Sequence, residues 1–276
     1  MIVADALRDA AQRLQPVSDT ARLDAELLMA HALGASRSDM LLRHMRDPAP
    51  EGFGALTDRR ARHEPVAYIL GHQEFYGRNF EVGPAVLIPR ADSETIVEAA
   101  LEACPAPRRV LDCGVGSGAL LVTVLVERPD AEGVGIDRSE DALEIARRNA
   151  AAHECRAQMI RRDWHEPGWT ADLGRFDLIL ANPPYVEDDA PLDPNVRDWE
   201  PAGALFAGAD GLADYRVLIP QLPALLAPGG VAVLEIGATQ AEAVAAIGAG
   251  AGFETILRAD LAGRPRAVIM RLGLGK

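Results

Sequence analysis

A glycine-rich segment holds the first residues whose types and spacing could do chemistry. Asp112 opens it, and Gly114, Gly116 and Gly118 follow at every second position. Because glycine has no side chain, the backbone here can approach a bound group closely at the start of the helix that follows. Asp137 ends the next expected strand roughly 20 residues later, where a carboxylate can accept hydrogen bonds from both hydroxyls of a ribose. These residues predict a site for an adenosine-containing cofactor.

The glycines alone leave three interpretations open. Gly114, Gly116 and Ala119 satisfy the fingerprint of a nicotinamide dinucleotide site. S-adenosylmethionine fits the same loop, and a glycine turn with a purely structural role is the third interpretation. Residues outside this pattern have to decide between them.

Two further features favour S-adenosylmethionine. A third glycine at Gly118, with Asp112 opening the loop, gives the form that is typical of sites for this cofactor. Asp163 and Trp164 follow the third expected strand and offer a polar edge and a flat face to adenine. We therefore predict S-adenosylmethionine as the cofactor and S-adenosylhomocysteine as its product. The predicted cofactor contacts are Gly114, Val115, Gly116, Ser117, Gly118, Asp137, Asp163, Trp164 and Asn182.

A second candidate segment is Asn182-Pro183-Pro184-Tyr185. It follows the apolar run 176–181 directly, and ligands of open α/β sheets bind at the carboxyl ends of the strands. The segment would therefore face the cofactor. The structural alternative is a Pro-Pro turn that merely ends a strand.

The chemistry of this segment suits a planar NH₂ group, such as the amide of glutamine or the exocyclic amine of adenine. Such a nitrogen is a poor nucleophile because its lone pair is delocalised. Asn182 can accept one N–H through its side chain, the carbonyl of Pro183 can accept the other, and Tyr185 can stack on the planar group. Orientation then carries most of the rate. We predict Asn182, Pro183 and Tyr185 as catalytic, all four residues including Pro184 as the substrate site, and no metal ligands.

Composition narrows the classes of protein further. The 276 residues carry a formal charge of −13, which disfavours partners bound through phosphates, so we expect neither specific nucleic-acid binding nor membrane binding. Cys104, Cys113 and Cys155 are widely spaced and odd in number, which suits neither a disulfide framework nor a zinc site. The first residues lack the basic start and apolar centre of a signal peptide. We expect a cytoplasmic monomer.

Hydrophobic spacing predicts two different parts of the chain. Residues 2–63 read as several short helices, one of them marked by Leu23, Leu27 and Leu28, and Ser36 is a helix start. Residues 74–76 and 79–82 are typical of two short strands around a turn at Gly77-Arg78.

From about residue 108 the chain alternates strand and helix. This alternation predicts a doubly wound α/β sheet. The expected strands are 110–112, 133–137, 157–161, 176–181, 230–236, 254–259 and 267–271, and the expected helices end at Glu127, cover 139–152 and follow Thr239.

Over nearly its full length the chain resembles the bacterial release-factor glutamine methyltransferases, the PrmC or HemK family. Any one matching segment is weak, but their order and spacing together are highly specific. The matching segments are residues 65–71, 74–77, 88–90, 176–178, 182–185, 200–201, 208–212 and 235–237.

The resemblance implies a class I S-adenosylmethionine-dependent methyltransferase with a Rossmann-like doubly wound sheet. Its domains would be a helical substrate-docking domain at 1–66, a β-hairpin linker at 67–90 and the methyltransferase domain at 91–276. It also implies methyl transfer to the side-chain nitrogen (N5) of the glutamine in the Gly-Gly-Gln motif of class I peptide chain release factors.

The chain departs from the family pattern at two places. Ala91 replaces a usual proline, although Asp92, Ser93 and Glu94 stay available to cap the following helix. Cys113 and Val115 replace the usual leucine and threonine of the glycine loop, and we interpret Cys113 as a small core residue. Neither change removes a group that the proposed chemistry needs.

Four rival functions share some of these features. A glutamine methyltransferase of a ribosomal protein would use identical chemistry with a different docking surface. An adenine N6 methyltransferase of nucleic acid would bring a basic recognition surface, which a charge of −13 disfavours. A noncatalytic S-adenosylmethionine-binding adaptor would need a damaged acceptor segment, and a nicotinamide oxidoreductase has no use for Asn182-Pro183-Pro184-Tyr185.

Overall fold

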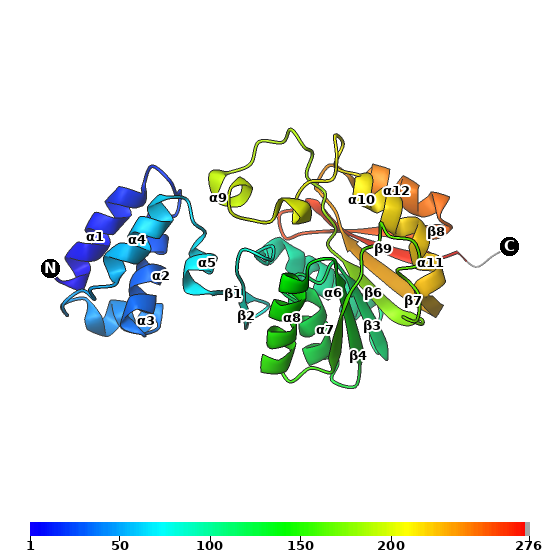
Figure 1. Cartoon of the computed structure of the whole chain (residues 1–276), viewed down its shortest axis with the longest axis horizontal. Coiled ribbons are helices and arrows are strands. Elements are labelled where there is room, and N and C mark those ends of the chain that lie inside the picture. The colour runs from blue at the N-terminus through cyan, green and yellow to red at the C-terminus, as the bar shows by residue number, and fades with distance from the viewer. Residues whose placement is uncertain (274–276) are drawn as a thin grey trace. The chain divides into compact units, whose positions relative to one another are not determined.

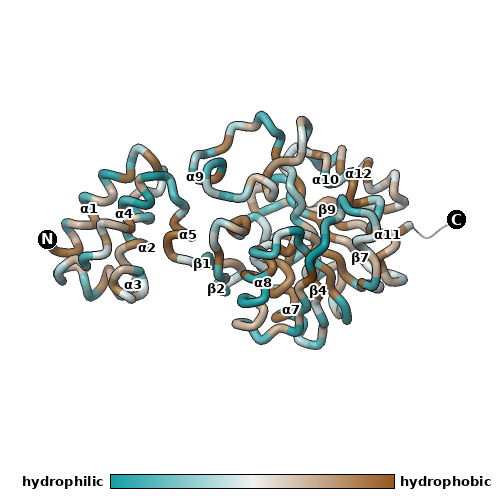
Figure 2. Tube along the Cα trace, viewed as in Figure 1, coloured by the Kyte–Doolittle hydropathy of each residue, from teal (hydrophilic) through white to brown (hydrophobic). Residues whose placement is uncertain are grey.

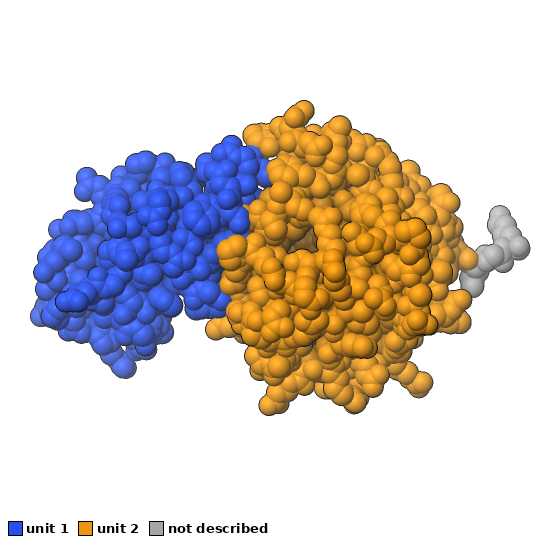
Figure 3. Space-filling model, in the orientation of Figure 1, with its two compact units in different colours: residues 1–73, 192–199 blue, residues 74–191, 200–276 orange. Residues whose placement is uncertain are grey.

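The computed structural model describes residues 1–273 and divides them into two compact units. Residues 1–73 and 192–199 form the smaller unit, and residues 74–191 and those from 200 onward form the larger one (Figure 3). No helix within the described residues is long and apolar enough to cross a membrane.

The smaller unit is helical, as the sequence predicts (Figure 1). Its core contains fully buried Leu7, Leu14, Leu28 and Met40. Ser36 caps a helix as expected, because its hydroxyl accepts a hydrogen bond from the backbone N–H of Asp39 at 3.0 Å. The helices are α1 (Val3–Leu14), α2 (Ala21–Leu33), α3 (Arg37–Asp39) with the π-helical turn Met40–His44, α4 (Phe53–Ala61), α5 (Val66–Leu70) and α9 (Pro194–Arg197).

The buried face of α2 includes a charged residue. Asp24 is buried and accepts a hydrogen bond from the Nε of Arg60 in α4 at 2.7 Å, whereas Leu23 is 42% exposed. A buried carboxylate needs such a partner. The leucine spacing therefore predicts the helix correctly but does not reveal which face is buried.

A β-hairpin follows, with β1 (His72–Phe75) and β2 (Arg78–Glu81). The predicted turn at Gly77-Arg78 is wrong by one residue, because the turn is Tyr76-Gly77. Tyr76 and Gly77 have φ of 52° and 70°. A two-residue hairpin turn of type I′ needs positive φ at both central positions, and Gly77 supplies the second of them.

Seven strands form the main sheet of the larger unit, in the order β5-β4-β3-β6-β7-β9-β8. Strands β5 to β7 in this order pair in parallel, while β9 is antiparallel to both β7 and β8. This confirms the predicted doubly wound sheet. The strands are β3 (Arg109–Cys113), β4 (Glu132–Asp137), β5 (Ala157–Arg161), β6 (Phe176–Ala181), β7 (Leu226–Glu235), β8 (Phe253–Ala259) and β9 (Pro265–Leu272).

Helices cover both faces of this sheet. Successive strand residues point to opposite faces, so Val110 packs under one layer of helices and Leu111 under the other. The first layer is α6 (Glu94–Ala103), α7 (Ala119–Glu127) and α8 (Glu140–Ala152), and the second is α10 (Ala213–Leu218), α11 (Leu222–Leu225) and α12 (Ala241–Gly250). The sequence ALLVTVLVE of α7 is hydrophobic along most of its length (Figure 2), as suits a helix against a buried sheet.

Short 3₁₀ turns complete the larger unit, at Ala91–Ser93, Ala202–Ala204 and Ile219–Gln221. Helices α10 and α11 are not among the predicted elements. The prolines Pro220 and Pro223 interrupt the helical pattern there, since each sits in the first turn of a new short helix.

Asp92, Ser93 and Glu94 do not cap α6, contrary to the expectation from sequence. Ser93 precedes the helix but makes no side-chain cap bond, because its hydroxyl donates to the buried carboxylate of Glu235 at 2.5 Å. Asp92 accepts from Arg264 and Arg266, and Glu94 accepts from the backbone N–H of Tyr76 at 2.9 Å. Charged and buried partners from distant parts of the chain compete successfully with the local cap.

Gly135 in β4 provides a test of how closely the glycine loop packs. A Cβ at Gly135 would lie 2.7 Å from a methyl carbon of Val115 and 2.6 Å from the sulfur of Met159. We predict that Gly135→Ala lowers the free energy of unfolding by about 1–3 kcal/mol through overpacking. Chemical denaturation measures it.

Gly250 in α12 is the matched control, since a Cβ added there would meet no neighbouring atom within 4 Å. Gly250→Ala should be neutral or stabilise by up to about 1 kcal/mol. Equal stability of the two variants would contradict the packing account.

Candidate active site

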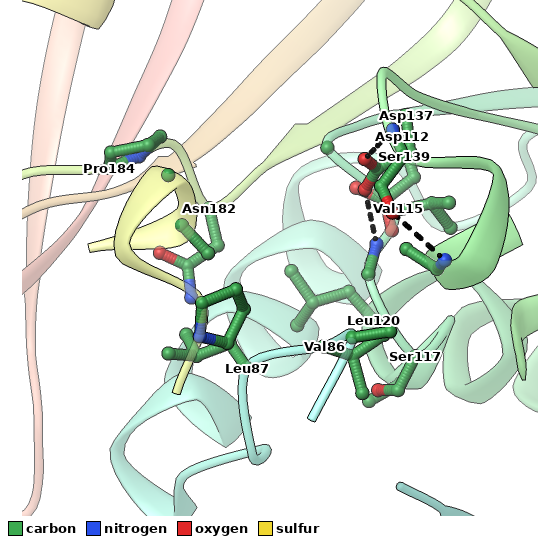
Figure 4. Close-up of a pocket in the computed structure, with 18 of the residues that line it drawn as sticks. Val86, Leu87, Asp112, Val115, Ser117, Leu120, Asp137, Ser139, Asn182 and Pro184 are labelled. Atoms are coloured by element: carbon green, nitrogen blue, oxygen red, sulfur yellow. Dashed lines mark hydrogen bonds between the residues drawn. The ribbon is translucent and has the colours of Figure 1, made fainter. Parts of the chain in front are cut away.

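The ends of three parallel strands bring the predicted site residues to one edge of the sheet. Cys113 in β3 pairs with Ile136 in β4 and with Ala181 in β6. The segments that follow these three strands therefore begin at the same edge of the sheet, next to one another. They line a cavity of about 280 Å³ in the larger unit (Figure 4).

The glycine loop (residues 114–118) forms one wall of this cavity. Gly114, Gly116 and Gly118 have φ of 78°, 52° and 84°, which a residue with a side chain rarely adopts. Val115 is buried, and the carbonyl of Ser117 accepts a hydrogen bond from the side chain of Asn149 in α8 at 2.8 Å. Gly114 and Gly116 line the cavity, whereas Gly118 does not, because it packs against Val122 and Ala146.

Asp137 lies beside the loop, as predicted. Its two oxygens accept hydrogen bonds from the backbone N–H of Gly116 at 3.1 Å and of Ser139 at 2.9 Å (Figure 4). Burial raises the pKa of Asp137, and these backbone bonds oppose that rise. Each oxygen keeps further acceptor capacity toward the cavity.

Asp112 is a cavity residue that was not among the predicted contacts. It is 1% exposed, lines the cavity, and its Oδ1 has no hydrogen-bond partner among the described residues. Burial raises the pKa of Asp112 to about 7, and the nearby charge of Asp137 adds to the rise. Its place at the start of the loop was visible in the sequence, but its burial was not.

Trp164 and Asp163 line the same cavity, and the ring of Trp164 lies beside the glycine loop. A Cβ added to Gly114 would lie 3.2 Å from the ring of Trp164, so only a glycine allows this approach. The indole N–H donates to Asp214 at 2.9 Å, and the backbone carbonyl of Trp164 accepts from Gln221 at 3.1 Å. Asp214 also lines the cavity, and sequence reasoning missed it because it comes from α10, 50 residues away.

Only part of the tetrapeptide at the end of β6 reaches the cavity. Asn182 and Pro184 line it, and the side chain of Asn182 makes no hydrogen bond to any residue within 1–273 (Figure 4). Pro183 and Tyr185 are not among the lining residues. Tyr185 instead donates its hydroxyl to Glu235 at 3.3 Å, and burial raises the pKa of Tyr185.

A further wall joins two segments that are distant in sequence. Residues 85–90 line the cavity, and Pro201, Gly203 and Ala204 line it as well. Glu200 connects them, since its carboxylate accepts from the backbone N–H of Ile88 at 3.1 Å and from the guanidinium of Arg90. The sequence shows both segments but not that they meet.

The site holds neither a metal cluster nor an activated thiol within the described residues. No group of three or more His, Cys, Asp or Glu side chains there could hold a metal ion. Cys113 is fully buried in the core, and burial raises the pKa of its thiol well above the ordinary value. The cavity offers backbone groups, carboxylates, an indole, an amide and the side chains of Arg90, Arg138 and Arg162, which suit binding and orientation.

This fold and this arrangement of segments are those of class I methyltransferases. A methyltransferase from Pyrococcus furiosus superposes with a TM-score of 0.55 over 79% of this chain and 100% of that one, at 18% identity, a likeness of fold. Residues 5–71 match the PrmC N-terminal domain family, and residues 91–196 match the methyltransferase small domain family.

Curated relatives narrow the class to one family. The release factor glutamine methyltransferase of Cereibacter sphaeroides is 43% identical over 99% of both chains. That of Geobacter sulfurreducens is 42% identical over 92% of this chain and 91% of its own. The chain belongs to the release factor glutamine methyltransferase family.

The buried Asp112 predicts a pH-dependent stability. Its folded pKa of about 7 lies above the usual value near 3.8, so the folded protein keeps this proton longer than the unfolded one. The stability contribution is full below about pH 4 and is lost as pH rises to about 7. The asparagine of Asp112→Asn does not titrate. Between about pH 4 and pH 7, the free energy of unfolding of this variant should therefore rise relative to that of the native protein by up to about 4 kcal/mol.

Asp260 is a control of opposite sign. Its pKa is lowered by hydrogen bonds from Arg264, so Asp260→Asn should lose stability relative to the native protein as pH rises. Denaturation curves at several pH values measure both variants. If the free energies of unfolding of Asp112→Asn and the native protein differed by the same amount at every pH, the raised pKa of Asp112 would be contradicted.

Proposed function

We propose that this protein transfers a methyl group from S-adenosylmethionine to the side-chain nitrogen (N5) of the glutamine in the Gly-Gly-Gln motif of class I peptide chain release factors. The observation that carries the proposal is that Asn182 opens onto the same cavity as the glycine loop and Asp137. Family membership supports the choice of a release factor as substrate.

The cavity residues fit S-adenosylmethionine. Asp137 has free acceptor capacity for the ribose hydroxyls, and Trp164 and Asp163 line the same cavity and can contact adenine. Asp112 has a buried oxygen without a partner among the described residues, which suits the positively charged amino group of the cofactor. The positive-φ glycines Gly114 and Gly116 leave the backbone of the cavity wall bare.

The acceptor segment fits a planar amide. Bound S-adenosylmethionine supplies a methyl group on a positively charged sulfur. The side-chain carbonyl of Asn182, which lines the cavity, accepts one N–H of the glutamine amide. Pro183 and Tyr185 lie outside the cavity lining, so the contact of the Pro183 carbonyl with the second N–H and the stacking of the Tyr185 ring stay predictions. As the nitrogen bonds to the methyl carbon, the bond from that carbon to sulfur would break and leave S-adenosylhomocysteine, and the nitrogen would become acidic enough to pass its proton to solvent without a strong base.

The helical segment 1–66 serves, in this proposal, to dock the release factor, and residues 67–90 link it to the methyltransferase domain at 91–276. Support comes from the match of residues 5–71 to the PrmC N-terminal domain. The protein would act as a monomer in the cytoplasm, where release factors work. Binding of the release factor rests on protein contacts in this account, with no specific binding of nucleic acid.

Asn182→Ala tests the proposal by separating chemistry from cofactor binding. It removes an orienting acceptor but leaves the glycine loop and Asp137 unchanged. We predict that turnover with purified release factor falls by about a hundredfold or more, the cost of losing about 3 kcal/mol of orientation. Affinity for S-adenosylmethionine, measured by calorimetry, should stay within a few fold.

Asp137→Ala is the matched control with the opposite pattern. It should weaken cofactor binding by about ten- to a hundredfold because hydrogen bonds to a charged group are lost. Near-native turnover in Asn182→Ala, or loss of cofactor affinity equal to that of Asp137→Ala, would refute the assigned roles.

A further inference from the structure

A carboxylate at the end of β7 connects the acceptor segment to a residue that lines the cavity. Glu235 is 2% exposed and accepts hydrogen bonds from the hydroxyl of Ser93 at 2.5 Å and of Tyr185 at 3.3 Å. Ser93 itself lines the cavity, and Tyr185 ends the acceptor segment, residues 182–185. One buried group therefore joins the acceptor segment to a residue of the cavity wall.

Tyr185 is held at its backbone as well. The side chain of Gln240 donates to the carbonyl of Tyr185 at 3.0 Å and to that of Gly211 at 3.1 Å, while its oxygen accepts from the N–H of Gly237. A Cβ at Gly211 would lie only 2.4 Å from the carbonyl oxygen of Tyr185. The backbone behind the acceptor segment has little room to move. Tyr185 is thus held at its backbone carbonyl and, through the bond to Glu235, at its side-chain hydroxyl.

The surroundings of Glu235 favour a fixed orientation of its carboxylate. The guanidinium of Arg266 lies 3.9 Å from it and is itself held by Asp92 at 3.1 Å. Burial raises the pKa of Glu235, while the bond from Ser93 and the charge of Arg266 oppose the rise. Burying a carboxyl group with this set of donors costs folding free energy, which indicates that the orientation of the group matters for the site.

We infer that Glu235 is a positioning residue for methyl transfer, which acts by holding Tyr185 in the acceptor segment and Ser93 in the cavity wall. Neither Glu235 nor Tyr185 lines the cavity, so Glu235 acts through the residues that do. The inference rests on the proposed function. Its mechanism is geometric: the bond to Tyr185 fixes the segment that carries Asn182, and the bond to Ser93 fixes a residue of the cavity wall.

A double-mutant cycle between Glu235→Gln and Tyr185→Phe tests this. Both changes are nearly isosteric, and each weakens the hydroxyl–carboxylate bond. We expect Tyr185→Phe to lower kcat by about tenfold and Glu235→Gln to lower it at least as much, since that change also weakens the bond from Ser93. The double variant should lower kcat by little more than Glu235→Gln alone, because the bond lost in Tyr185→Phe is already weakened there. The Kd for S-adenosylmethionine should stay within about twofold in all three, a separation that a general loss of structure would not produce.

Tyr215→Phe is the matched control. Tyr215 also donates a buried hydroxyl to Glu235, but to its backbone carbonyl, at 2.7 Å. Its loss should lower the melting temperature and leave kcat unchanged. A fall in kcat equal to that of Tyr185→Phe would show that any damage near Glu235 slows the reaction, and would overturn the inference.

The remaining outcomes also decide. Additive losses in the cycle, or cofactor affinity that falls in step with kcat, would overturn the positioning role while the native enzyme still methylates its substrate. Failure of the native enzyme to methylate a release factor would instead reject the proposed function. Should Glu235→Gln not fold, Ser93→Ala replaces it: a several-fold fall in kcat with unchanged cofactor affinity supports the role, and an unchanged kcat overturns it.

Discussion

Parallel pairing places Cys113 of β3 beside Ile136 of β4 on one side and beside Ala181 of β6 on the other. Side chains alternate between the two faces of a sheet. A shift of one residue in the register of β3 or β6 would therefore move the glycine loop or Asn182 to the other face, away from the cavity. The apolar residues of these strands fix the register, because each is buried under one of the two helix layers. Everything at the cavity depends on this alignment.

Carboxylates shielded from solvent are the second constraint on the site. Asp112 and Glu235 are buried and Asp137 is half-buried; all three lie in or next to the cavity, and burial raises the pKa of each. Such groups destabilise a fold unless they are paired with hydrogen-bond donors of the protein or of a bound ligand. Asp137 and Glu235 are bonded to donors of the protein, whereas Asp112 keeps an oxygen without a partner among the described residues, which in our account the cofactor satisfies.

The sequence predicted the features that depend on residues close together in the chain. The alternation of strand and helix, the glycine loop, Asp137 and the cap at Ser36 could all be read from spacing and residue type. The sequence could not reveal partners that only the fold brings together. Asp214 reaches Trp164 across 50 residues and Ser93 reaches Glu235 across 142, so the first was missed and the second was assigned to a helix cap. The hairpin turn was misplaced because Tyr76 accepts positive φ, which its residue type does not suggest.

In our proposal the cavity orients a glutamine amide toward a methyl donor, and the position of the transferred methyl group reports whether it does. The decisive experiment incubates the native enzyme with isotopically labelled S-adenosylmethionine and a purified class I release factor, and then maps the methyl group by mass spectrometry. We predict one methyl group, on the side-chain nitrogen of the glutamine in the Gly-Gly-Gln motif. Methyl on another residue of the release factor, or no methyl group on the release factor at all, would contradict the proposal, even if every cofactor contact proved correct.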